Sequence, residues 1–125
     1  MNTLVLLVER GSAWSPETWL LDHGGERGAL GQVVIERRPE WLNVLRDDRT
    51  LNDFEPEERL RLAEVMTEPE TYLIEWRGSV LLEKLLRSVP PGTNVVVDND
   101  YGLMVSVHEV ANLPLDAWVT ASKLP

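Results

Sequence analysis

The sequence contains no cysteine and comparatively few basic residues. Without cysteine, this chain of 125 residues has no disulfide, no thiolate ligand for a metal and no thiol nucleophile. Its 21 acidic residues outnumber its 12 lysines and arginines, so its formal net charge is −9. A field of that sign repels phosphate backbones and anionic lipid surfaces. We therefore expect neither a nucleic acid nor a membrane as its partner.

Long apolar runs are also lacking. The N-terminal run spans only Leu4–Val8, which is too short for a signal peptide and far below the roughly 20 residues that cross a bilayer. No internal repeat, low-complexity tract or long linker divides the chain. We therefore expect residues 1–125 to form a single globular domain in the cytoplasm.

Catalytic and cofactor motifs are missing as well. There is no Gly-x-Ser-x-Gly elbow, and the glycines between residues 24 and 31 lack the lysine of a phosphate-binding loop. His108-Glu109 has no second histidine four residues after the first, as a zinc protease requires. We expect a binding protein rather than an enzyme, with no cofactor.

The pattern of apolar residues predicts an α+β fold with a single mixed sheet of about five strands and about three helices. Apolar or β-branched runs predict strands at 4–8, 32–37, 71–76, 94–97 and 103–110. Helical spacing predicts helices at 39–47, 55–66 and 79–88, and a Ser-Pro-Glu start signal at residue 15 predicts a further short one. Residues 71–97 have the order strand, helix, strand, which predicts two parallel strands if both join one sheet.

One group of residues is a weak candidate for a metal site. Asp98, Asp100 and Glu109 fall at the first, third and twelfth positions of a calcium loop. The match fails at the fifth and sixth positions, where Gly102 offers no ligand and Leu103 replaces the required glycine. Turn formation by Asp and Asn explains the same residues without a metal. The alternative function built on this group is a small enzyme that depends on a divalent metal held by Asp98, Asp100, His108 and Glu109.

The negative charge is concentrated in residues 47–70. This segment has nine carboxylates against three arginines, a net charge of −6. Part of the cluster is explained by helix formation, because Glu55-Pro56-Glu57-Glu58 would place three acids near the positive end of a helix dipole. Asp47 and Asp48 would lie at the unfavourable end of the helix predicted over 39–47, so they must be solvated or used in binding.

Five tryptophans are many for a chain of this length, and tryptophan is enriched in binding hot spots. Trp41 and Trp76 lie in apolar-patterned elements and are expected to be buried. Trp14 follows a Gly-Ser-Ala sequence and precedes Ser-Pro, so we expect it to be partly exposed in a loop.

These observations favour an acidic protein-binding module that neutralises a basic partner. The most specific form of this hypothesis is an immunity or antitoxin protein that inhibits a nuclease-type toxin, whose cleft must be basic to hold phosphates. The residues expected to bind the partner are Asp47, Asp48, Asp53, Glu57, Glu58 and Trp14. The free chain is expected to be a monomer or a weak homodimer. A subunit of a homo-oligomeric assembly, in which the charge only confers solubility, is a further alternative.

Overall fold

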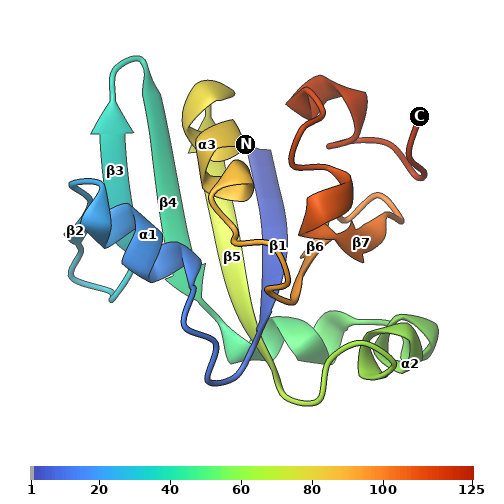
Figure 1. Cartoon of the computed structure of the whole chain (residues 1–125). Coiled ribbons are helices and arrows are strands. Elements are labelled where there is room, and N and C mark those ends of the chain that lie inside the picture. Colours follow the sequence, from blue (N-terminus) through green and yellow to red (C-terminus); the bar gives the residue numbers. More distant parts are fainter. Residues whose placement is uncertain (1) are drawn as a thin grey trace.

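The computed structural model describes residues 2–125, and an antiparallel sheet lies at its centre (Figure 1). In the described chain the strands are β1 (Asn2–Glu9), β2 (Glu26–Arg27), β3 (Val33–Arg37), β4 (Glu40–Arg46), β5 (Pro69–Arg77), β6 (Val95–Asp98) and β7 (Met104–Ser106). Their order in the sheet is β2-β3-β4-β5-β1-β6-β7, and all neighbouring strands are antiparallel. The predicted α+β class is confirmed. The predicted sheet of about five strands in mixed directions is corrected to seven strands, each antiparallel to its neighbours.

Short helices lie between the strands and after the last of them. The α-helices are α1 (Pro16–Asp22), α2 (Pro56–Ala63) and α3 (Val80–Arg87), and the 3₁₀ helices are η1 (Asp48–Asp53), η2 (Val107–Glu109) and η3 (Leu115–Ala117). The helices predicted over 55–66 and 79–88 therefore exist with shorter bounds. The start signal at Ser15 is also confirmed, because its side chain accepts a hydrogen bond from the backbone N–H of Thr18. Among the described residues, no helix has the length and apolar character needed to cross a membrane.

The helix predicted over 39–47 is wrong, because this segment forms β4. Leu42 and Val44 point into one buried cluster, whereas Trp41 and Leu45 lie on the other face and are half-buried. When both faces of a strand carry apolar residues, its sequence pattern cannot be told from that of a helix over so few residues. Pro39, expected to open a helix, instead lies in the tight turn between β3 and β4.

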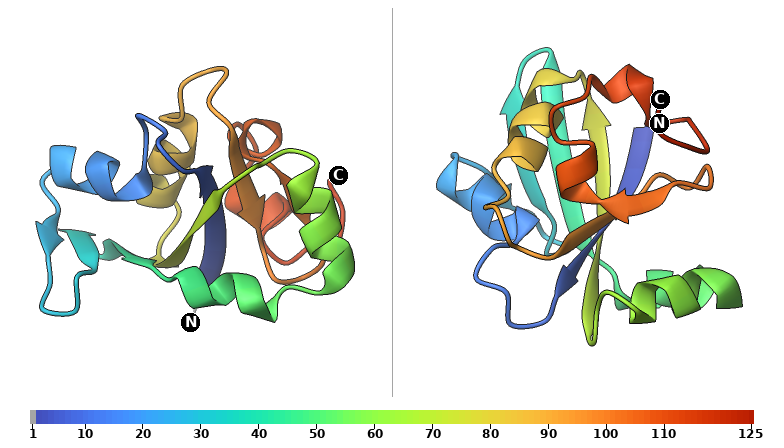
Figure 2. Two further views of the ribbon diagram at one scale, coloured as in Figure 1. Left: turned by 90° about the horizontal axis from the view of Figure 1, so that it is seen from below. Right: turned by 45° about the vertical axis from the view of Figure 1, so that its right-hand side comes forward.

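Two layers of helices cover the two faces of the sheet. The larger core lies under α1, α3 and the C-terminal 3₁₀ helices, and its inward strand residues include Leu4, Leu6 and Val8 of β1. The smaller core lies under η1 and α2, where Val5 and Leu7 of the same strand point. Figure 2 shows α2 on the opposite side of the sheet from α1 and α3. The acidic segment thus forms most of the layer that covers this face of the sheet.

Strand β1 lies between β5 and β6 and pairs with both. Since it is antiparallel to each of them, β5 and β6 run parallel to one another, joined through α3, as the strand-helix-strand pattern predicted. The continuous apolar run Leu4–Val8 is buried on both faces of this inner strand. The strand predicted over 103–110 is shorter in the structure, where β7 pairs with β6 as a hairpin and η2 follows it.

Candidate functional site

The acidic segment 47–70 crosses the face of the sheet that carries the smaller core. Its anchors are Phe54, Leu62 and Met66, which are buried against β1 and β6. Leu62 and Met66 are four residues apart, so they lie on one side of the helical turn that they share. The opposite side of α2 therefore faces solvent.

Carboxylates hold the first turn of α2. The Glu58 carboxylate accepts a hydrogen bond from the backbone N–H of Glu55 at 3.0 Å, and Glu57 lies in the same turn. Acidic side chains are favoured there by the positive end of the helix dipole and by the unpaired N–H groups of the first turn. Glu58, one of the predicted contact residues, therefore has a structural role in starting this helix.

Asp47 and Asp48, also predicted contact residues, are engaged locally. Oδ1 of Asp47 accepts a hydrogen bond from the backbone N–H of Arg49 at 3.0 Å and lies 3.4 Å from Nε of the same arginine. Oδ1 of Asp48 lies 3.4 Å from Nε of Arg46. Neighbouring arginines thus compensate both carboxylates, which weakens their contribution to the field around the molecule.

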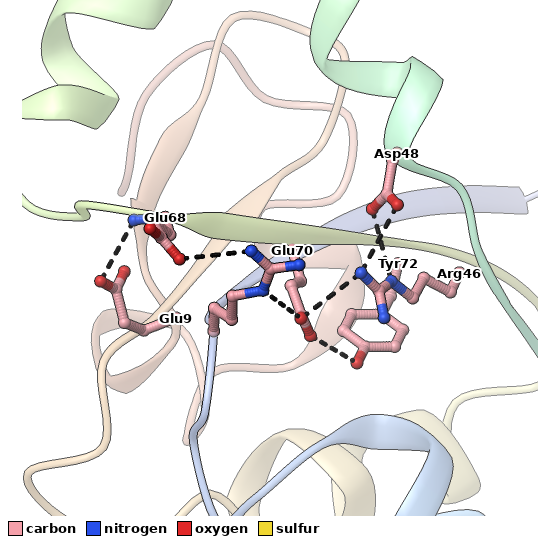
Figure 3. A network of polar contacts seen from close by, with 7 residues as sticks. Glu9, Arg46, Asp48, Glu68, Glu70 and Tyr72 are labelled. Atoms are coloured by element: carbon pink, nitrogen blue, oxygen red, sulfur yellow. Dashed lines mark hydrogen bonds and ion pairs between the residues drawn. The ribbon is translucent and has the colours of Figure 1, made fainter.

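A polar network at the ends of β1, β4 and β5 compensates two more carboxylates (Figure 3). Glu70 lies 3.4 Å from Nη2 of Arg46 and 3.7 Å from Nε of Arg10, and Glu68 lies 3.5 Å from Nη1 of Arg10. The buried Tyr72 donates its hydroxyl hydrogen to Glu70 at 3.4 Å. Burial, together with the negative charge of Glu70, raises the pKa of Tyr72 to about 12. The network ties the base of the acidic segment to the sheet.

Two further contacts fix the chain that follows α2. The Glu9 carboxylate accepts hydrogen bonds from the backbone N–H groups of Thr67 at 3.1 Å and Glu68 at 3.2 Å. The side-chain amide of Asn94 donates to the backbone carbonyl of Val65. The chain that leaves the C-terminal end of α2 is therefore held by the last residue of β1 and by the loop before β6.

Four exposed carboxylates lie near α2 without an ionic partner. They are Asp53, Glu55, Glu57 and Glu64, which we call the α2 acidic patch. Within residues 2–125, none of them lies in an ion pair. Arg59 directs its guanidinium toward the backbone instead, where it donates to the carbonyl oxygens of Asn52 at 3.0 Å and Phe54 at 3.2 Å. The four carboxylates outnumber the two arginines of α2, Arg59 and Arg61, so the region keeps a net negative charge.

An exposed leucine lies within this patch. Leu60 follows Glu57 by three residues and precedes Glu64 by four, so the three side chains share one side of α2. Its exposed fraction is 69%. Leu60 is not among the contact residues expected from sequence, although a lone leucine on the solvent side of a charged helix is a recognisable signal.

Trp14, the predicted aromatic anchor, does not lie with the acidic residues. Its half-buried side chain packs against the larger core, beneath α1 and α3. The acidic segment is on the other face of the sheet. The structure therefore brings Asp53 and Glu57 together with Leu60, and leaves Trp14 apart from them.

The weak metal candidates form a turn. Asp98 is only 6% exposed, and its Oδ1 accepts a hydrogen bond from the backbone N–H of Asp100 at 3.1 Å. His108 lies with Nε2 2.9 Å from the carbonyl oxygen of Thr93, and Glu109 is exposed in η2. Among the described residues, there is no group of three or more histidine, cysteine, aspartate or glutamate side chains that could hold a metal ion.

Comparisons with protein-family models, with curated proteins and with solved structures gave no match to this chain. Function is therefore inferred from the geometry and the charge of the α2 region.

Proposed function

We propose that this protein is an acidic binding module that neutralises a basic protein, most specifically an immunity or antitoxin protein that inhibits a nuclease-type toxin. The observation that carries the proposal is the α2 acidic patch. Its carboxylates are exposed, lie in no ion pair within residues 2–125, and stand on or beside a helix that Leu62 anchors to the sheet.

The physical reason is electrostatic complementarity. A nuclease must hold phosphates, so its cleft carries positive charge, and carboxylates on a fixed scaffold can occupy the same field. Opposite fields raise the rate of association and penalise wrong partners. Single exposed ion pairs add little affinity, so an apolar contact must supply much of the rest. Leu60 offers such a contact in the middle of the patch.

The proposed contact set differs from the one expected from sequence. Asp53 and Glu57 remain in it and are joined by Glu64 and Leu60. Asp47, Asp48 and Glu58 have local partners that compete with any ligand. Trp14 leaves the set because it packs on the opposite face of the sheet.

The proposal is tested by using the chain as bait in native cells and assaying what it captures. We expect a basic protein with nuclease activity, and we expect the free chain to abolish that activity at a one-to-one ratio. Capture of a protein without a basic surface, or of a nuclease that stays fully active in the complex, would contradict the proposal.

A further inference from the structure

A small apolar pocket opens beside the α2 acidic patch. Its volume is about 230 Å³, and it lies between η1, α2 and the start of β5. Its apolar lining includes Leu51, Leu62, Ala63 and Met66, and its polar lining includes Asn52, Arg59 and Thr67. Sites for free small molecules usually measure about 300–1,000 Å³. This pocket has the size for one side chain of a binding partner.

Two polar groups of the pocket lining already have partners inside the protein. The guanidinium of Arg59 donates to two backbone carbonyls of the η1–α2 connection, and the backbone N–H of Thr67 donates to Glu9. An occupant therefore meets mainly carbon on the wall. An apolar side chain fits these surroundings better than a polar one, which would lose its water without gaining hydrogen bonds.

Exposed carboxylates stand next to the pocket in the sequence. Asp53 follows the lining residue Asn52, and Glu64 follows Ala63. Neither carboxylate lies in an ion pair within the described chain. Residues on either side of an inserted side chain would meet this negative charge, so lysine or arginine is favoured there.

We infer that the pocket receives one large apolar side chain of the basic partner, of the size of phenylalanine, flanked by lysine or arginine. The inference rests on the proposed function and names the feature that the partner must present. Insertion of the side chain supplies affinity, and the flanking cations supply attraction to the α2 acidic patch.

The test uses capped five-residue peptides as probes and follows the amide signals of the labelled protein by NMR. The first peptide has phenylalanine between two pairs of lysines, the second has alanine in its place, and the third keeps phenylalanine but replaces every lysine by serine. We expect the first to bind about tenfold or more tightly than the second, because burying a phenylalanine ring contributes that much. The signals that shift should include those of Leu62, Ala63 and Met66.

A matched pair of variants checks the location. Ala63→Leu fills the pocket from its wall and should remove the preference for phenylalanine. Ala29→Leu makes the same change in the exposed loop between β2 and β3, and should keep that preference. Urea unfolding of both variants confirms that they fold.

The outcomes separate the pocket from the proposed function. Equal binding of the two lysine peptides would overturn the pocket and leave the charge-based function standing. Equal binding of the lysine and serine peptides that carry phenylalanine would overturn the requirement for flanking cations and would count against the proposed function. Absence of binding by all three peptides at millimolar concentration would overturn the inference.

Discussion

Asp98 is a carboxyl group that the fold buries on the face of the sheet covered by η1 and α2. Burial is the main reason that its pKa is raised, and the negative charge of Glu58 adds to the effect. The hydrogen bond from the N–H of Asp100 acts in the opposite direction. A carboxyl group whose pKa is higher in the folded than in the unfolded protein favours folding while it is protonated. That advantage is lost as the pH rises through the pKa of the folded state.

Asp98→Asn should therefore raise the stability of the protein at neutral pH. The amide oxygen can accept the same hydrogen bond from Asp100, and the cost of a buried charge disappears. Thermal unfolding at pH 7 should show a higher midpoint than the wild type, and the difference should vanish below pH 3.8, the ordinary pKa of this group. The exposed Asp116→Asn serves as the control and should change little. A lower midpoint for Asp98→Asn at pH 7 would contradict this account, because the charge of Arg61 and the hydrogen bond from Asp100 would then outweigh the cost of burial.

The hydrogen bonds of Asn99 show that a turn-forming residue can also hold distant parts of the chain together. The sequence predicted a turn over residues 98–102, and the turn exists. The Asn99 side chain also donates to the carbonyl oxygens of Trp118 and Ala121, both at 2.8 Å, and accepts from the N–H groups of Tyr101 and Leu103. Such contacts over about twenty residues depend on the tertiary fold, which local sequence patterns do not encode.

At the scale of elements, α3 depends on a carboxylate from a distant strand. Ser79, the residue before this helix, makes no capping hydrogen bond with its side chain. Glu40 of β4 takes this role and accepts from the backbone N–H of Val80 at 3.3 Å and of Leu81 at 2.9 Å. Gly78 permits this approach, because a Cβ atom there would lie 2.3 Å from Cγ of Glu40.

Glu40→Ala should therefore destabilise the protein by about 1–2 kcal/mol, as the loss of a helix cap does. The helix buries four leucines in the larger core, so its loosening should be seen in the global unfolding transition. Urea unfolding measures the change, with Glu36→Ala on the adjacent strand as an exposed control. Equal stability of Glu40→Ala and the wild type would show that this carboxylate does not hold the helix.

The length of an element and its apolar spacing explain which helices and strands could be predicted from the sequence. The helix with Leu81, Leu82, Leu85 and Leu86 was predicted because its apolar spacing has one interpretation at that length. The apolar spacing of the short segment 39–47 fits either a helix or a strand. Pairing with β3 and β5 makes this segment a strand. The position of β1 between β5 and β6 could not be predicted, because strand order depends on contacts across the whole chain.

For the whole molecule, the decisive property is how charge is distributed after folding. The sequence located the negative segment, and two of the expected contact residues, Asp53 and Glu57, lie in the α2 acidic patch. It could not show that arginines outside the segment, Arg10 and Arg46, compensate Asp48, Glu68 and Glu70. Folding thus moves the centre of negative charge toward α2.

The most direct test of the proposed role is the rate at which the chain associates with its captured partner, measured by stopped flow at several salt concentrations. Two triple variants have the same net charge: Asp53→Lys, Glu57→Lys, Glu64→Lys near α2, and Glu26→Lys, Glu109→Lys, Asp116→Lys elsewhere. The first set spares Glu58, whose carboxylate starts the helix, and unfolding measurements confirm that both variants fold. We expect the α2 variant to associate at least about tenfold more slowly than the wild type at low salt, with a flatter salt dependence, and the other variant to lose much less. Equal rates for the two variants would contradict the account, because the charge near α2 would then have no special part in recognition.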